Sequence, residues 1–297
     1  MKKILALLLA CSMLFAFAAC GGNTEDETTT AAPETTVAEE TTAAEETTVA
    51  AGEETTAAEE TTLAAEETTV AAGETTTAAA ATVPATTEEI VAYFNTAVNG
   101  VKTNAKSVKH HYSKISLNGT PVLPSWADSL LKLFGGAEKF LDDQLSSNSK
   151  GEQVYTGSDI KNRFPVENES WASKLTAADV KSATCTPSAD GKTYTIKVVT
   201  IADGKSSTVK HGGGHAPKAF NVVLPGVVND ALGKIPGATK LVGGEAEMNY
   251  PSSTATITVD VATGNVVKAE YDLKWTINFG TSVVIPFTTL DSYTISY

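Results

Sequence analysis

The 297-residue chain has little arginine, little cysteine and, over a long stretch, no aromatic residue. Arg163 is its only arginine, so the chain lacks the clustered basic side chains that a nucleic-acid-binding surface needs. Of its three cysteines, two lie within the first twenty residues, and only Cys185 lies further along. We therefore expect no disulfide in the folded part. Between Phe17 and Tyr93 there is no aromatic residue, which excludes a hydrophobic core in that stretch.

The net negative charge of the chain comes from one segment. The formal net charge is −13, but residues 21–87 carry all of the excess, with acidic residues and no basic residue. From residue 88 onward, acidic and basic residues are equal in number. The acidic character therefore describes that segment and says nothing about the partners of the folded part.

The N-terminus has the pattern of an export signal. Lys2-Lys3 precedes an uncharged apolar run over residues 4–19, which is shorter than the about 20 residues that a spanning helix needs. The run ends in Phe17-Ala18-Ala19-Cys20, which resembles the lipobox of bacterial lipoproteins. This resemblance implies that residues 1–19 are a signal peptide, that Cys20 is lipidated, and that the protein is anchored to the cell membrane on its extracytoplasmic face. An ordinary secretory signal with a chance cysteine after it is the alternative.

Residues 20–85 are rich in Thr, Ala and Glu and contain a degenerate repeat. Glu-Glu-Thr-Thr begins at positions 39, 45, 53, 59 and 66. A solenoid repeat needs enough large apolar residues for each unit to pack on the next, and this segment has only isolated ones. We expect a disordered acidic tether, and a flexible chain of about 65 residues spans roughly 45 Å.

Residues 86–297 are expected to form a single domain. Thr86 and Glu89 have capping-box spacing and predict a helix over about 87–104, followed by a strand over 106–117. Two short helices are expected on either side of Gly135-Gly136. A further helix is expected over 171–180, capped at Thr176.

After residue 180 the hydrophobic period becomes that of strands. Strands over 181–187 and 192–202 are expected to flank the turn at Asp190-Gly191, and the apolar segment 220–232 is expected to be partly helical, interrupted at Pro225. Strict alternation then predicts a strand around 254–261 and a long return strand over 267–279. The stretches 283–287 and 290–297 are expected to complete a meander.

These elements predict the α+β class: a long, curved antiparallel sheet, with one face covered by a few helices. Element order and anchoring resemble the half-barrel carriers of the LolA and LppX type, and this resemblance implies that acyl chains are held between sheet and helices. The buried face of the return strand is then a candidate apolar ligand face, although ordinary core packing uses the same residues. The ligand face consists of Tyr271, Leu273, Trp275, Ile277 and Phe279.

Residues with catalytic or metal-binding potential are few. The His211-Gly-Gly-Gly-His215 segment is similar to an esterase oxyanion loop, but the chain has no Gly-x-Ser-x-Gly nucleophile motif. His211 and His215 have the i, i+4 spacing of a paired metal site on a helix, but the three glycines between them disfavour a helix, so solvated histidines are expected and a weak surface metal site is the alternative. The acidic pairs Asp142-Asp143 and Glu167/Glu169 lack the spacing of a calcium loop, and Cys185 is expected to be a buried structural residue. We therefore predict no catalytic residue, no metal and no cofactor.

Two functions follow as hypotheses. The first is a non-enzymatic lipoprotein that binds an apolar, lipid-like ligand between sheet and helices. The second is a surface-displayed or cell-envelope module that binds a protein or polysaccharide through the outer, polar face of the sheet. In both, Cys20 attaches the protein to the membrane.

Overall fold

A computed structural model describes residues 83–147 and 151–297. The signal peptide, Cys20 and nearly all of the tether therefore lie outside the described residues. Six α-helices occur in the described part: α2 (Thr87–Asn104), α3 (Ser125–Leu131), α4 (Ala137–Ser147), α5 (Ser158–Arg163), α6 (Pro225–Gly233) and α7 (Ala238–Val242). Three 3-10 turns accompany them: η1 (Lys132–Phe134), η2 (Ala177–Asp179) and η3 (Ala216–Lys218). In the described part of the chain no helix is both long and apolar enough to cross a bilayer.

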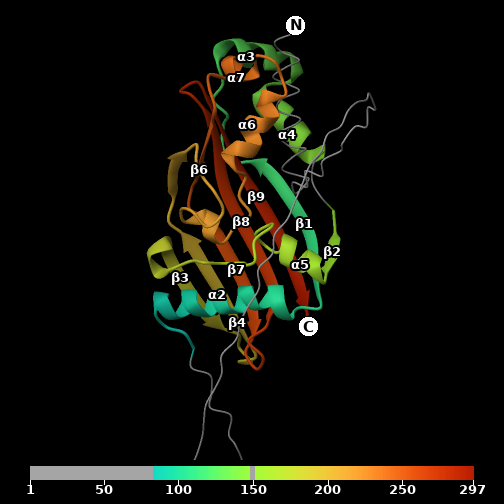
Figure 1. The fold of residues 1–297 in the computed structure, drawn as a ribbon, viewed down its shortest axis with the longest axis vertical. Helices are drawn as coiled ribbons and strands as arrows, with labels where there is room; N and C mark the ends of the chain where they lie inside the picture. Colours follow the sequence, from blue (N-terminus) through green and yellow to red (C-terminus); the bar gives the residue numbers. More distant parts are fainter. Residues whose placement is uncertain (1–82, 148–150) are drawn as a thin grey trace, which may run out of the picture. The chain divides into compact units, whose positions relative to one another are not determined.

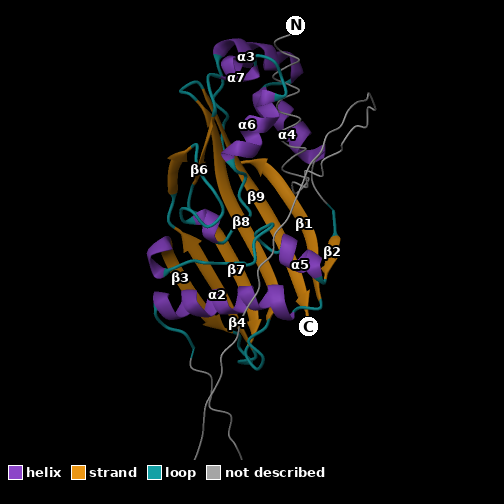
Figure 2. Cartoon of the chain, in the orientation of Figure 1, coloured by secondary structure: helices purple, strands orange, loops and turns teal. Residues whose placement is uncertain are grey.

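Among the described residues, nine strands form one antiparallel sheet (Figures 1 and 2). They are β1 (Ser107–Leu117), β2 (Gln153–Thr156), β3 (Val180–Pro187), β4 (Thr193–Thr200), β5 (Asp203–Ser206), β6 (Ala246–Tyr250), β7 (Thr254–Asp260), β8 (Val266–Phe279) and β9 (Val283–Ser296). Their order is β2-β1-β9-β8-β7-β4-β3, with β6 also paired to β8 and β5 to β6. The predicted α+β class, with an antiparallel sheet and helices, is therefore confirmed.

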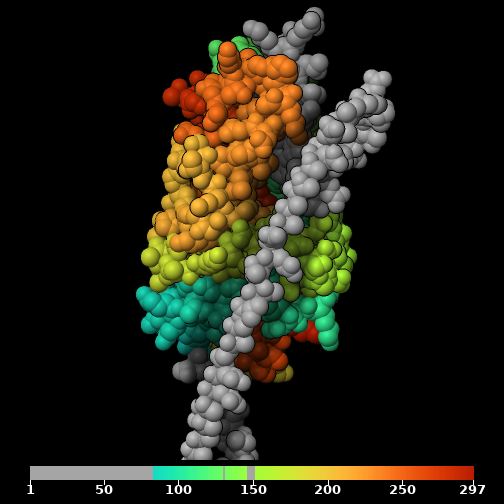
Figure 3. All heavy atoms as spheres, in the orientation of Figure 1, coloured from blue at the N-terminus to red at the C-terminus, as the bar shows by residue number. Residues whose placement is uncertain are grey.

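Helices and loops cover one face of the sheet. Helix α2 crosses the strands and contacts β3, β4 and β8, α4 contacts β1, and α6 contacts β6. Figure 3 shows this side with all atoms, where α2, the segment before β3 and the α6–α7 region lie over the sheet. The buried side chains between sheet and cover form one continuous hydrophobic cluster. This cluster is the main hydrophobic core of the described residues.

Helix α2 begins as the capping box predicts. Thr86 Oγ1 accepts from the Glu89 backbone N–H at 3.2 Å, and a Glu89 carboxylate oxygen accepts from the Thr86 N–H at 3.1 Å. These bonds satisfy backbone donors that a helix start otherwise leaves unpaired. The strand pairs at Asp190-Gly191 and at 254–279 also form as predicted.

The predicted helix over 171–180 is wrong, because only η2 at its end is helical. Two asparagines of α2 explain the difference. Asn99 Oδ1 accepts from the Ala172 and Ser173 N–H groups at 2.6 and 3.1 Å, and Asn95 Nδ2 donates to the Leu175 carbonyl at 2.7 Å. These side chains satisfy the backbone in an extended conformation, so no helix is needed. The expected cap at Thr176 is present and starts η2.

Three further details differ from the sequence-based expectation. Pro225 starts α6 rather than interrupting a helix, since proline fits the first helical turn. A bulge between Thr258 and Val259 places Val266, not Val267, in the core. Cys185 is half-buried on β3, at the end of the strand order, because β3 has no strand beyond it.

Candidate functional site

The candidate apolar ligand face lies on β8, with all five side chains on the buried face, as the alternation predicts. Trp275 stacks on Phe287 with ring centroids 4.4 Å apart, and its indole Nε1 donates to Thr289 Oγ1 at 2.9 Å. Tyr271 makes edge contacts with Phe164 and Phe220. Other protein side chains therefore fill the space in front of this row, and none of its residues lines the groove described next.

A groove of about 330 Å³ lies between strands β1 and β9 and the segments that cover them. The residues that line it come from parts of the chain that are far apart in sequence. They are His110, Ser113, Ile115, Tyr155, Arg163, Glu167, Asn168, Glu169, His211, Asn221, Val222, Val223, Leu224, Val227, Thr289, Asp291 and Tyr293. The volume is at the lower end of the range of about 300–1,000 Å³ for ligand pockets.

His110 on β1 is the most enclosed polar residue of the groove wall. Its Nδ1 lies 2.9 Å from Tyr155 Oη, and its Nε2 lies 3.0 Å from Asp291 Oδ1. The imidazole also stacks on the Tyr293 ring, with centroids 4.3 Å apart. Both ring nitrogens are therefore engaged within the protein. In this arrangement His110 has no free nitrogen to act as a general base on a bound molecule.

Tyr155 and Arg163 form the adjoining part of the wall. The Tyr155 hydroxyl donates to Gln153 Oε1 at 3.0 Å, and the Arg163 guanidinium lies over the Tyr155 ring, 5.7 Å from its centroid. Burial raises the pKa of Tyr155 to about 12, although the nearby arginine opposes this shift. Tyr155 thus stays a neutral hydrogen-bonding group at physiological pH.

The buried Lys102 supports the segment of the groove wall that carries Glu167 and Glu169. Lys102 Nζ donates to the backbone carbonyls of Lys161, Val166 and Glu169 at 2.7, 2.9 and 2.7 Å. Burial lowers the pKa of Lys102 to about 8, and the negative charge of Glu169 opposes this shift. Asn168, between Glu167 and Glu169, has a φ of 58°. One ammonium group therefore fixes the path of the segment that carries Arg163 and both glutamates.

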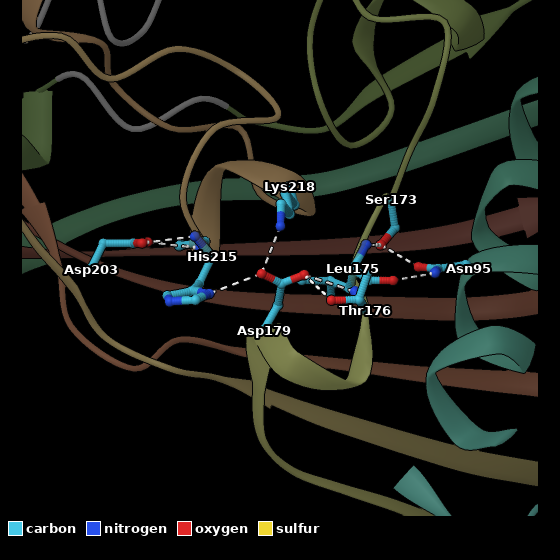
Figure 4. A network of polar contacts seen from close by, with 9 residues as sticks. Asn95, Ser173, Leu175, Thr176, Asp179, Asp203, His215 and Lys218 are labelled. Atoms are coloured by element: carbon cyan, nitrogen blue, oxygen red, sulfur yellow. Dashed lines mark hydrogen bonds and ion pairs between the residues drawn. The ribbon is translucent and has the colours of Figure 1, made fainter. Parts of the chain in front are cut away.

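The His211–His215 loop is held by two aspartates (Figure 4). Asp203 accepts from the backbone N–H groups of His215 and Ala216 at 2.7 and 2.8 Å. At Gly214, whose φ is 82°, a Cβ atom would lie 2.8 Å from Asp203 Oδ1, so only glycine fits. The Gly212 and Gly213 N–H groups donate to carbonyls at 2.9 and 3.0 Å. These four amides are used within the loop and are not directed at an oxyanion.

Asp179 joins this loop to the sheet. One carboxylate oxygen accepts from Lys218 Nζ at 2.7 Å and contacts His215 Nδ1 at 2.9 Å, and the other accepts from the Thr176 N–H and hydroxyl at 2.8 and 2.7 Å (Figure 4). Burial alone would raise the pKa of Asp179, but the hydrogen bonds from Lys218, Thr176 and His215 outweigh it and lower the pKa to about 2. The network is structural: the Asp179 carboxylate is buried, and its partners Thr176, His215 and Lys218 are partly or largely exposed.

The histidines and acidic residues that the sequence named as candidates lie in different parts of the structure. His110 and His211 both line the groove, whereas His111 contacts Thr294 at 2.7 Å outside it. Glu167 and Glu169 line the groove, and Asp142 and Asp143 lie on α4. Among residues 83–147 and 151–297, no group of three or more His, Cys, Asp or Glu is arranged to hold a metal ion.

Sequence reasoning missed the groove itself. Tyr155, Arg163 and Asp291 were not named as site residues, and only the rarity of arginine drew attention to Arg163. Comparisons with protein-family models, with curated proteins and with solved structures found no match to this chain. The fold and the groove define an α+β domain with an open antiparallel sheet and a small cleft between the sheet and the segments that cover it.

Proposed function

We propose that this protein is a lipid-anchored, extracytoplasmic binding protein that holds a small single-chain amphiphile in the groove. The observation that carries this proposal is the change in polarity along the groove. His110 lies opposite Tyr293, Ser113 opposite Asp291, and Ile115 opposite Thr289, so the wall becomes less charged along β1. Val222, Val223, Leu224 and Val227 add apolar surface from the cover.

The size of the groove limits the ligand. The five residue-to-residue steps from His110 to Ile115 correspond to about 16 Å at roughly 3.3 Å per residue. A volume of about 330 Å³ favours one small molecule over a lipid with two or three acyl chains. The apolar ligand expected from sequence is thus narrowed to an amphiphile, with its chain beside Val227 and its polar group beside Arg163, Glu167 and Asp291.

The groove supports binding rather than catalysis. Both nitrogens of His110 are engaged, and Asp291 Oδ1 already contacts that ring at 3.0 Å. A nucleophile such as Ser113 would need a free base within hydrogen-bond distance. The wall groups are instead placed to orient a polar group, as in most small-molecule sites.

A panel of probes with the same ten-carbon chain tests the proposal. Decanoate, decyltrimethylammonium and decyl maltoside, each below its micellar concentration, are titrated by calorimetry into the chain from Gly21 to Tyr297. We expect at least one probe to bind, with an affinity about tenfold lower in Val227→Asp, because the added charge costs about 1–3 kcal/mol against an apolar chain. Val227 is 41% exposed, so the variant is expected to fold.

Val154→Asp is the matched control, because Val154 is 60% exposed and does not line the groove. Its affinity should equal that of the wild type. Absence of binding by all three probes, together with no copurifying ligand by native mass spectrometry, contradicts the proposal. An equal loss of affinity in Val227→Asp and Val154→Asp contradicts the placement of the ligand in the groove.

A second candidate function uses the outer face of the sheet, where the bulge between His110 and Tyr112 leaves the Tyr112 side chain 42% exposed. The register places Tyr112, Ser292, Glu270, Thr256 and Lys197 in one row across five strands. A shallow hollow lies along this row. An exposed aromatic ring beside hydroxyl and charged groups suits a protein or polysaccharide of the cell envelope.

Tyr112→Ala tests this second function. We expect at least a tenfold loss in the amount of purified envelope polysaccharide or protein retained by the immobilised chain, because an aromatic anchor carries a large share of such contacts. Leu290→Ala, also on the outer face at 36% exposure, should have the smaller effect. Retention that is the same in wild type and Tyr112→Ala would remove the outer face from consideration.

A further inference from the structure

Three large apolar side chains are exposed together on helix α3 and its 3-10 continuation η1. Trp126 is 40% exposed, Leu133 79% and Phe134 51%. Trp126 lies at the start of α3, and Leu133 and Phe134 lie in the 3-10 turn that directly follows the helix, so the three are exposed within one short segment of the chain. Ala127 and Leu131, on the inward side, are fully buried or nearly so, at 0% and 4% exposure. These two residues anchor the helix. Phe134 in addition makes an edge contact with Phe140 of α4, with ring centroids 6.4 Å apart, and is still 51% exposed. We call Trp126, Leu133 and Phe134 the apolar tip.

The apolar tip lies at one end of the domain. Helices α3, α4, α6 and α7 lie together there, beside the end of the sheet that contains the turn between β8 and β9 (Figure 1). The charged neighbours are largely neutralised in pairs, Lys132 with Asp128 at 3.1 Å and Lys139 with Asp143 at 2.8 Å. Exposed large apolar residues that cluster in this way mark an interaction surface.

We propose that the apolar tip is a surface that docks on the lipid bilayer, inserting Trp126, Leu133 and Phe134 into the interfacial region. Tryptophan, leucine and phenylalanine are the side chains that partition there. About 60 residues separate Cys20 from Val83, the first described residue. A flexible chain of that length has an r.m.s. span of roughly 45 Å, which corresponds to an effective concentration of the domain at the bilayer in the millimolar range. This step rests on the lipid anchor of the proposed function.

Docking at this end also suits the proposed ligand. Val227, at the apolar end of the groove, is exposed on α6, and α6 lies at the same end of the domain as α3 (Figure 1). A single-chain amphiphile leaving the bilayer would thus meet the apolar end of the groove first. Its chain would be transferred with less exposure to water than by entry at the charged end.

The experiment uses the unlipidated chain from Gly21 to Tyr297, so that any vesicle binding is independent of the Cys20 anchor. Trp126 is the reporter, because Trp171 and Trp275 are 8% and 2% exposed and contribute buried emission. With phosphatidylcholine vesicles we expect a blue shift of the fluorescence, protection from acrylamide and flotation with the vesicles. Added salt should leave all three unchanged, since the insertion is apolar.

Leu133→Ser with Phe134→Ser, which keeps the reporter, is expected to weaken partition at least tenfold and to leave the domain folded, with a small loss of stability from the Phe134–Phe140 contact. Leu290→Ser is the matched control on the outer sheet face. Unchanged fluorescence and no flotation of the wild type would overturn the proposal. A blue shift that grows with protein concentration in the absence of lipid would also overturn it, and would assign the tip to a second copy of the chain. Radiolabelled palmitate incorporation at Cys20, compared with Cys20→Ser in cells, tests the anchor separately.

Discussion

Replacing Lys102 by methionine is expected to lower the free energy of unfolding by about 3–5 kcal/mol, the cost of removing one member of a buried charged contact. Three backbone carbonyls, those of Lys161, Val166 and Glu169, would lose their donor at once. Relief from burying the ammonium offsets only part of this loss, because an unpaired buried carbonyl costs about 1–3 kcal/mol by itself. Urea denaturation at neutral pH measures the change.

Besides lowering the free energy of unfolding, Lys102→Met is expected to loosen the groove wall locally. Amide hydrogen exchange in residues 161–169 is expected to accelerate more than exchange in β8, because the lysine holds that segment in place. Binding of the ten-carbon probes should weaken in parallel, since Arg163, Glu167 and Glu169 lie on the same segment. Lys106→Met, at an exposed lysine just beyond α2, is the control and should change neither quantity. Unaltered stability in Lys102→Met would show that the segment is held by other contacts.

Replacing Asp179 by alanine is expected to lower the free energy of unfolding by about 2–3 kcal/mol at pH 7. The variant leaves Lys218 and His215 without their carboxylate and removes the acceptor of the two Thr176 bonds. The cost is below that of a fully buried pair because the side chains of Lys218 and His215 are 26% and 32% exposed.

The same residue predicts a dependence on pH. The pKa of Asp179 is about 2 in the folded chain and 3.8 ordinarily, so the folded state favours the carboxylate. Its stabilising contribution is therefore complete above about pH 5 and is lost as the pH falls through about 2, by about 2 kcal/mol. We expect the difference in stability between wild type and Asp179→Ala to shrink over that range.

Asp230→Ala, at an exposed aspartate of α6, is the control and should leave both the stability at pH 7 and its acid dependence unchanged. Denaturation curves at pH 7, 4 and 2.5 make the comparison. A stability difference that stays constant down to pH 2 would mean that the hydrogen bonds to Thr176 do not depend on the charge of the carboxylate.

Local sequence patterns correctly predicted most of the elements whose backbone hydrogen bonds join residues that are close in sequence. The α2 capping box involves only residues within three positions of each other. The β3–β4 and β7–β8 pairs are joined by short turns, and their alternation decides which side chains face the core. In these elements nearest neighbours in sequence are also neighbours in space, which is why sequence reasoning succeeded.

The failures occurred where distant residues decide the conformation. The helical pattern at 171–180 is overridden by Asn95 and Asn99, which lie more than seventy positions earlier. The groove unites β1, β2, the end of α5, three loops, α6 and β9, and no local pattern could indicate that His110 meets Asp291, 181 positions away. Even the correctly predicted row on β8 faces Phe164, Phe220 and Phe287. Whether an apolar face is filled depends on what the rest of the chain places against it.

The sequence by itself determined the division of charge, the single cysteine of the folded part, and the α+β class, because composition and periodicity are properties of short stretches. The scarcity of arginine drew attention to Arg163, but the sequence did not indicate the site to which this side chain belongs. Only the tertiary structure decided that Arg163 lies over Tyr155 at the wall of a groove, that Lys102 holds that wall, and that Trp126, Leu133 and Phe134 are left outside the core. The reason is physical: burial and hydrogen-bond partners are set by contacts between segments, and these exist only once the chain has folded.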